Sequence, residues 1–267
     1  MSILVFSFFY LAMFIVASVF SALGAGGGVL YTPVQLFFGI EFHTAATTSL
    51  FLIMITSLSA TLVFRKAATV DWPLAIFLES STMLGAFLGG LYSGHFSGRF
   101  LIYLFSGVLA VASFFMVKQF DIPNRCGGMP SSFFRWRRTM GSEIYCVNLA
   151  LALPVALVAG IVSGLIGVSG GILKVPMLVL LFGVPMNIAV GSSAFMVGLT
   201  ASGGFLGHLA AGHFDWKVAL LLAPGMFVGA QIGARTSVKV DKTKMKRFFG
   251  YVLAVLAAFL IIRNSLP

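Results

Sequence analysis

Residues 24–33 read GAGGGVLYTP, and residues 167–176 read GVSGGILKVP. Each stretch places a cluster of glycines between a long apolar run and a short one, and a proline follows, Pro33 in the first and Pro176 in the second. Glycine permits a tight turn and lets another backbone or a ligand approach closely. Short apolar segments behind a glycine break are typical of re-entrant or discontinuous membrane helices. The two stretches therefore predict two such short helices, at 28–40 and 171–183.

Long apolar runs dominate the rest of the chain. Of the 267 residues, 59% are hydrophobic and 9% are charged, and the mean hydropathy is +1.05, whereas a soluble domain carries about 25% charged residues. Runs of about 20 apolar residues can span a bilayer as helices. The composition argues strongly against a soluble enzyme or a nucleic-acid-binding domain and predicts an all-α polytopic membrane protein. Its eight long predicted helices are 3–23, 44–64, 73–92, 100–117, 147–166, 188–207, 217–234 and 248–263.

The two halves of the chain match each other at a nearly constant shift. The glycine stretches are 143 residues apart, and from residue 39 to residue 111 the shift is 144 without a further gap, with 20 of 73 positions identical. Rare residues recur too, because Asp71-Trp72 returns as Asp215-Trp216. We also expect the first run to be retained rather than cleaved as a signal peptide, because no basic residue precedes it. The predicted parts are a first transmembrane repeat at 1–117, a basic connecting loop at 118–146 and a second transmembrane repeat at 147–267.

The placement of positive charge predicts the orientation of the repeats. The net charge is +10, and three clusters, at 118–146, 235–247 and 65–66, hold 13 of the 17 lysines and arginines. The counterparts of the last two clusters, 91–103 and 209–210, hold only Arg99. If basic loops face the cytoplasm, equivalent loops lie on opposite sides of the membrane. We therefore expect inverted repeats, with both termini outside and the 118–146 loop inside, an architecture that places a transport site near the midplane.

The glycine breaks are the first candidate site. The short helix behind each break begins with free N–H groups and the positive end of a helix dipole, which attract anions. Inverted repeats would bring two such ends together near the middle of the bilayer. A hinge or tight helix packing is the alternative explanation. The candidate substrate-binding residues in the breaks are Gly24, Gly27, Gly28, Gly167, Ser169, Gly170 and Gly171.

Two runs of hydroxyl residues follow the short helices, 47–49 and 192–193. We expect each run to open the next long helix. Hydroxyls in that position either cap the helix and pack it, or donate hydrogen bonds to a substrate oxygen. The candidate substrate-binding residues in these runs are Thr48, Ser49, Ser192 and Ser193.

Two ionisable residues fall inside predicted membrane segments. Lys174 lies three residues after the second break and would balance the charge of an anion, unless it snorkels to the cytoplasmic side. Glu79 is a candidate proton carrier, with a structural hydrogen bond as the alternative. Their counterparts in the other repeat, Tyr31 and Ala223, carry no charge.

Other features point away from further chemistry. Gly85 and Gly229 belong to G-x-x-x-G faces, which we assign to close helix packing. The four histidines and two cysteines suggest no metal site, and we expect Cys126 and Cys146 to be unpaired thiols. No nucleotide motif occurs, and no HExxH, GxSxG or paired carboxylates indicate an enzyme. The expected partners are a small anion and the lipid bilayer, with no cofactor and no nucleic acid. Assembly into a homo-oligomer is also possible.

The order of these motifs in both halves resembles the sulfite exporter TauE/SafE family of membrane permeases. The resemblance rests on a G-x-x-G-G break, a following proline, a hydroxyl run and G-A-x-x-G in each half. It implies a secondary transporter, an exporter or exchanger of a small sulfur-containing anion such as sulfite or an organosulfonate, in the inner (plasma) membrane of a bacterium. A passive anion channel or uniporter of the same architecture is the alternative. The motifs do not identify the anion, the direction of transport or the coupling ion.

Overall fold

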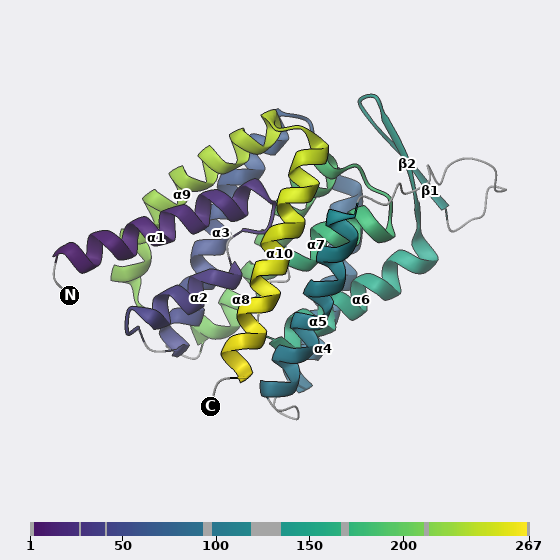
Figure 1. Cartoon of the computed structure of the whole chain (residues 1–267). Helices are drawn as coiled ribbons and strands as arrows, with labels where there is room; N and C mark the ends of the chain where they lie inside the picture. The colour runs from purple at the N-terminus through teal and green to yellow at the C-terminus, as the bar shows by residue number, and fades with distance from the viewer. Residues whose placement is uncertain are drawn as a thin grey trace. The chain divides into compact units, whose positions relative to one another are not determined.

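The computed structural model describes residues 3–26, 28–40, 42–92, 98–118, 135–166, 171–210 and 214–265 (Figure 1). Helices begin and end close to the predicted positions, because long apolar runs flanked by polar or glycine-rich segments leave little choice of boundary. The helices are α1 (Ile3–Ala22), α2 (Gly28–Phe37), α3 (Phe42–Lys66), α4 (Trp72–Tyr92), α5 (Gly98–Val117), α6 (Leu149–Ile166), α7 (Gly171–Pro176), the π-helical turn η2 (Met177–Leu181), α8 (Met186–Ala210), α9 (Trp216–Lys239) and α10 (Lys242–Ser265).

The helices have the length and composition expected of a polytopic membrane protein. Within the described part of the chain, four segments are long and apolar enough to cross a bilayer: Val5–Ala22, Thr47–Lys66, Met186–Leu206 and Trp216–Lys239. Shorter apolar segments lie at Trp72–Leu88 and Leu149–Ser163. The chain is therefore mostly helical and rich in membrane-compatible helices, and the finer prediction of eight spans in inverted repeats stays a prediction.

The connecting segment contains structure that the sequence analysis missed. Strands β1 (Arg135–Met140) and β2 (Glu143–Asn148) pair antiparallel as a hairpin, with Met140 opposite Glu143. Gly141 makes the turn at φ +58°, in the left-handed region that glycine adopts without strain. The expectation of unpaired thiols is wrong for Cys146, which is disulfide-bonded. Cys126, the other cysteine of the chain, lies outside the described residues.

The chain divides into two compact units, each of which takes helices from both predicted repeats. The first unit comprises residues 1–75 and 190–239, and the second comprises residues 76–189 and 240–267. The first unit thus holds α1, α2, α3, α9 and most of α8, and the second holds most of α4, α5 to α7, the hairpin and α10.

In the first unit, α9 lies along α1, the yellow-green and purple helices of Figure 1. Small residues bring the two backbones together: a β-carbon at Gly229 would lie 3.0 Å from the carbonyl oxygen of Phe14, and Gly233 lies directly against Ser18. Helix α9 also contacts α3, where Ser59 Oγ donates to the carbonyl oxygen of Phe227 at 2.7 Å. The packing role assigned to Gly229 is confirmed.

In the second unit, α4 and α6 cross in the equivalent way. Gly85 lies directly against the carbonyl oxygen of Leu157, and Gly160 lies against that of Thr82. Gly85 is the repeat counterpart of Gly229, and Leu157 is the counterpart of Phe14. The packing role of Gly85 is therefore confirmed, and the same crossing occurs once within each unit.

Candidate functional site

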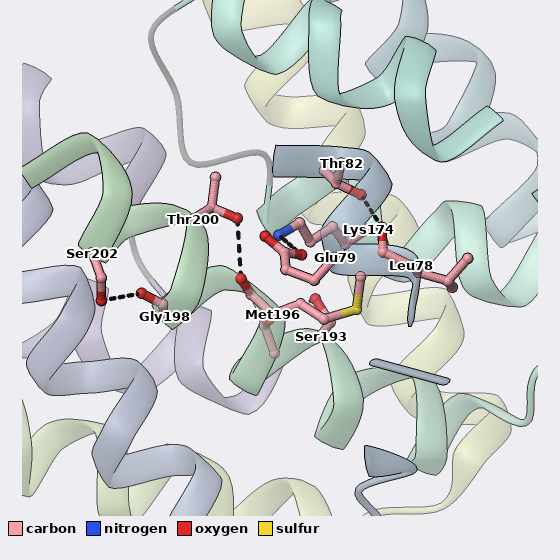
Figure 2. Close-up of polar contacts among 10 residues, drawn as sticks. Leu78, Glu79, Thr82, Lys174, Ser193, Met196, Gly198, Thr200 and Ser202 are labelled. Atoms are coloured by element: carbon pink, nitrogen blue, oxygen red, sulfur yellow. Dashed lines mark hydrogen bonds and ion pairs between the residues drawn. The ribbon is translucent and has the colours of Figure 1, made fainter. Parts of the chain in front are cut away.

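A buried ion pair joins α4 to α7 in the second unit. Lys174 Nζ donates to Glu79 Oε2 at 2.7 Å, and the two side chains are 2% and 1% exposed (Figure 2). An isolated charge in an apolar interior is very costly, and an opposite charge in contact offsets much of that cost. Lys174 therefore does not snorkel to an exposed end of its helix. Each residue had been singled out separately, and the structure brings the two together.

The position of Glu79 follows from the buried face of α4. Ala75, Leu78, Glu79 and Thr82 are all buried, at the spacing that places residues on one side of a helix. The hydroxyl of Thr82 donates to the carbonyl oxygen of Leu78 in the same helix at 2.9 Å (Figure 2). On the neighbouring face, Ser81 Oγ donates to the carbonyl oxygen of Leu153 in α6 at 2.9 Å. Together with the glycine crossing, this bond fixes α4 against α6 and so holds Glu79 in place.

The position of Lys174 follows from the short helix α7. Pro176 lacks an N–H and its ring clashes with the carbonyl one turn back, so the α-helical pattern ends there. The chain continues as one π-helical turn, in which the N–H of Phe182 donates to the carbonyl oxygen of Met177 at 3.3 Å. Such turns occur frequently at functional sites. Lys174 thus lies between the second glycine break and an irregular turn.

The equivalent positions in the first unit carry no charged side chain. Tyr31, the counterpart of Lys174, is fully buried in a core cluster with Leu52, Ile53 and Leu222. Ala223, the counterpart of Glu79, packs against the same cluster. The fold therefore places uncharged residues at these two positions in one repeat and an ion pair at them in the other.

The first glycine break is held by hydroxyl groups. Gly24 and Gly26 have φ of +70° and +68°, which larger residues adopt only with strain. Ser193 Oγ donates to the carbonyl oxygen of Gly24 at 2.9 Å, and Thr56 Oγ1 donates to that of Gly26 at 3.0 Å. A β-carbon at Gly24 would meet the backbone of Val190. At Gly24, then, the close neighbour is protein backbone rather than space for a ligand. This observation favours the alternative explanation of tight packing at the first break.

The hydroxyl runs lie deeper in their helices than expected. Because α3 begins at Phe42 and α8 at Met186, the runs fall in the second turn of each helix, and the expectation that they open the helices is wrong. Ser49 Oγ accepts hydrogen bonds from Thr32 and Gln35, and Ser192 Oγ accepts one from the N–H of Asp71. Ser49 therefore connects α3 to α2, while Ser192 and Ser193 connect α8 to Asp71 before α4 and to the first glycine break.

One residue of these runs is different. Thr48 is fully buried, and its hydroxyl has no hydrogen-bond partner among the described residues. Ser21 and Ser57, which the sequence analysis did not single out, are also buried and unpartnered in the same unit. Ser57 Oγ lies 3.1 Å from the place of a β-carbon on Gly26, beside the first break. Buried hydroxyls without partners are rare in proteins and call for an explanation, such as a ligand that they bind.

Several predicted residues are not tested. Gly27, Gly167, Ser169 and Gly170 lie outside the described residues. Gly28 and Gly171 are the first residues of α2 and α7, as predicted. A joint site formed by two helix N-termini stays a prediction.

An apolar cavity of about 840 Å³ lies in the second unit between α5, α6 and the α7–η2 segment. Its lining offers an anion almost no hydrogen-bond donor, so we do not assign the substrate to it. Sequence analysis had no signal for it, because its residues come from three separated segments. They are Tyr103, Gly107, Val111, Phe115, Pro154, Val155, Val158, Ala159, Val162, Leu173, Pro176, Met177, Leu180 and Leu181.

Apolar helices of spanning length, with an ion pair buried among them, are features of a polytopic membrane transporter. The chain belongs to the sulfite exporter TauE/SafE family, whose model matches residues 9–260. It is 31% identical over 261 residues to the probable membrane transporter protein YunE of Bacillus subtilis (strain 168), covering 92% of this chain and 94% of that one.

More distant relatives cover a similar share of the chain. A probable membrane transporter protein of Xylella fastidiosa (strain 9a5c) is 26% identical, over 91% of this chain and 89% of its own. Protein MJ0441 of Methanocaldococcus jannaschii, also named a probable membrane transporter, is 23% identical, over 93% and 92%. No solved structure gives a significant match. The family and the names of the relatives indicate a membrane transporter and not an enzyme.

Proposed function

We propose that the chain is a secondary transporter of a small anion, and that the anion is sulfur-containing, such as sulfite or an organosulfonate. The observation that carries the proposal is the buried ammonium group of Lys174. A cation inside a membrane segment is costly and marks a substrate or ion pathway by default. The name of the family supports sulfite or a related anion as the substrate.

In this proposal, Lys174 supplies the charge that balances the anion. The glycine breaks supply backbone N–H groups, and buried hydroxyls supply further donors. Thr48 fits that role best among the hydroxyl candidates, because its hydroxyl is buried and unpartnered. Ser49, Ser192 and Ser193 contribute by holding the helices that carry these donors.

The proposed orientation is that of inverted repeats in a bacterial inner membrane, with both termini outside. Thirteen of the 17 basic residues then face the cytoplasm. The disulfide of Cys146 favours the opposite side for the hairpin, because cytoplasmic thiols are kept reduced. We base the proposal on the charges, which come from three separate segments, and expect the disulfide to open in the cell.

Transport into proteoliposomes tests the function. The purified protein is reconstituted and supplied with labelled sulfite, thiosulfate, taurine or sulfoacetate. We expect uptake of at least one of these compounds, and a loss of uptake in Lys174→Met. Lys217→Met is the matched control, because Lys217 is an exposed lysine at the start of α9. Equal activity of the two variants would show that Lys174 has no role in transport.

The same liposomes distinguish a coupled transporter from a passive channel or uniporter. A coupled transporter accumulates the anion above its equilibrium level when an ion gradient is imposed. A channel of the same architecture only dissipates the gradient of the anion itself. If the internal anion concentration never exceeds its equilibrium level under any imposed ion gradient, the protein is a channel or uniporter and not a coupled transporter.

A further inference from the structure

We propose that the transported anion and a proton bind together, because the anion displaces Glu79 from Lys174 and Glu79 then takes up a proton. The inference rests on the proposed function and names the coupling ion and the charge class of the substrate. In the state seen here, the carboxylate of Glu79 occupies the position beside Lys174 Nζ, at 2.7 Å, that a substrate oxygen would take. Substrate and carboxylate therefore compete for the same ammonium group.

The burial of the pair turns this competition into coupling. Glu79 is 1% exposed, so a displaced carboxylate would be left charged in an apolar interior. An ion that loses its partner in such a place is strongly destabilised, and protonation removes the charge. Anion binding and proton binding at Glu79 thus favour each other, and by linkage each raises the affinity of the other to the same extent.

Among the described side chains around the pair, no second acidic group could take up the proton in place of Glu79. Helix α6, which packs against α4, carries no titratable residue, and neither does η2. On α5, Tyr103 is half exposed, and the side chain of Arg99 lies outside those described. Asp71 precedes α4, and its carboxylate already accepts a hydrogen bond from the N–H of Leu74. Tyr92, at the far end of α4, has a side chain outside those described, and the segment 167–170 contains no titratable residue.

The other repeat shows that the fold does not need the ion pair. At the equivalent positions, Tyr31 belongs to a buried core cluster without charged residues, and Ala223 packs against that cluster. A buried ion pair is in general no more stabilising than well-packed apolar residues. The pair is therefore retained for a task that the fold itself does not require.

Charge balance at the pair predicts the charge of the substrate. Lys174 and Glu79 together carry no net charge. A monoanion bound to Lys174, with Glu79 protonated, again leaves no net charge, whereas a dianion leaves one uncompensated negative charge in an apolar interior. The site should therefore take monoanions, such as hydrogensulfite or methanesulfonate, in preference to sulfate.

The experiment uses proteoliposomes with labelled methanesulfonate and labelled sulfate as probes. For the wild type, we expect an inward proton gradient to drive methanesulfonate above equilibrium, with one proton entering per anion as read by an internal pH dye. The apparent KM for methanesulfonate should rise with pH, by up to about tenfold per pH unit, because one proton is linked to binding. Sulfate uptake should be at least tenfold slower.

Two variants separate coupling from folding. Glu79→Gln can still accept a hydrogen bond from Lys174 but cannot carry a proton, so exchange of methanesulfonate should persist with a KM that does not change with pH, and without accumulation. The double variant Lys174→Tyr/Glu79→Ala introduces the residues of the first repeat. It should remain monodisperse and transport neither probe.

The outcomes separate this inference from the proposed function. If the wild type transports neither probe nor any of the four compounds above, the proposed function fails and the inference fails with it. If it transports one of the four but not methanesulfonate, only the inference is overturned. If the wild type transports methanesulfonate without proton entry, or if Glu79→Gln accumulates it as the wild type does, only the inference is overturned. If Glu79→Gln proves inactive, the proton count of the wild type decides alone. Sulfate uptake as fast as methanesulfonate uptake would overturn the charge class.

Discussion

The crossing of α4 and α6 gives a prediction whose size can be worked out from the structure. A β-carbon added at Gly85 would meet the carbonyl oxygen of Leu157, and its next neighbours, the carbonyl carbon of Leu157 and the backbone nitrogen of Ile161, would lie at 3.0 Å. All three are backbone atoms, which cannot rotate aside as a side chain can. The variant Gly85→Ala therefore forces the two helices apart.

The expected cost is the balance of two terms. Overpacking a tight contact by one methyl group costs about 1–3 kcal/mol. Replacing a glycine inside a helix by alanine returns about 0.5–1 kcal/mol. We therefore expect Gly85→Ala to lower the free energy of unfolding by up to about 2.5 kcal/mol.

Gly107 is the matched control, because it also lies inside a helix but a β-carbon there would meet nothing within 4 Å. Gly107→Ala should be neutral or stabilising by up to about 1 kcal/mol. Thermal unfolding of the purified protein, followed by loss of the monodisperse peak after heating, ranks the variants. Gly85→Ala should melt below the wild type, and Gly107→Ala at or above it. If Gly85→Ala melted at or above Gly107→Ala, the tight crossing would not exist in the protein.

Three further predictions test other parts of the molecule. Gly27→Leu and Gly170→Leu should abolish transport while the protein stays monodisperse, because a side chain would block approach to the backbone; wild-type rates in both would make the breaks hinges remote from the substrate. If the 118–146 segment faces the cytoplasm, both cysteines should react with a bulky maleimide in permeabilised cells without added reductant, and neither should react in intact cells. A disulfide that persists in cells would instead indicate that the segment faces outward. Hydrogen bonds from the N–H groups of Lys244 and Thr243 lower the pKa of Asp241, which lies outside the membrane segments, below its ordinary 3.8. The contribution of Asp241 to stability should therefore be present at neutral pH and be lost as the pH falls through the lowered pKa. The melting temperatures of the wild type and Asp241→Ala should then converge in acid.

Sequence alone predicted the helices because each is a local feature. An apolar run bounded by glycine, proline or charge defines its own ends, and every described helix begins and ends within a few residues of its run except at the amino end of α10 and the carboxyl end of α9. Those two ends extend into the basic 235–247 segment, where the helix contains too many polar residues to appear as an apolar run. The hairpin was missed because arginines dominate β1, so the strand shows no clear alternation of apolar and polar residues. The turn η2 was missed because a π turn depends on the backbone geometry after Pro176, which the sequence pattern does not indicate.

The candidate site was predicted one residue at a time, and its contacts were not. Lys174 and Glu79 are 95 residues apart in sequence and lie in different repeats, so nothing local indicates that they meet. The hydroxyls of Ser192 and Ser193 were singled out as a cap or as donors to a substrate oxygen, and the structure instead shows them bonded to distant parts of the chain. Their partners, the N–H of Asp71 and the carbonyl oxygen of Gly24, are more than 100 residues away. Pairing across such distances depends on the tertiary fold, which composition and spacing do not contain.

The comparison of the two repeats separates what the fold needs from what function needs. The glycine crossing occurs in both units, with Gly85 and Gly229 at equivalent places, so it serves the architecture that both halves share. The charge occurs in one unit, at Lys174 and Glu79, while Tyr31 and Ala223 occupy the same places in the other without it. A buried ion pair gives little net stability, and loss of one partner costs a great deal. A pair that is costly to break and present in only one of the two repeats fits the proposed role in transport, and Lys174 with Glu79 is where we expect transport to respond to charge.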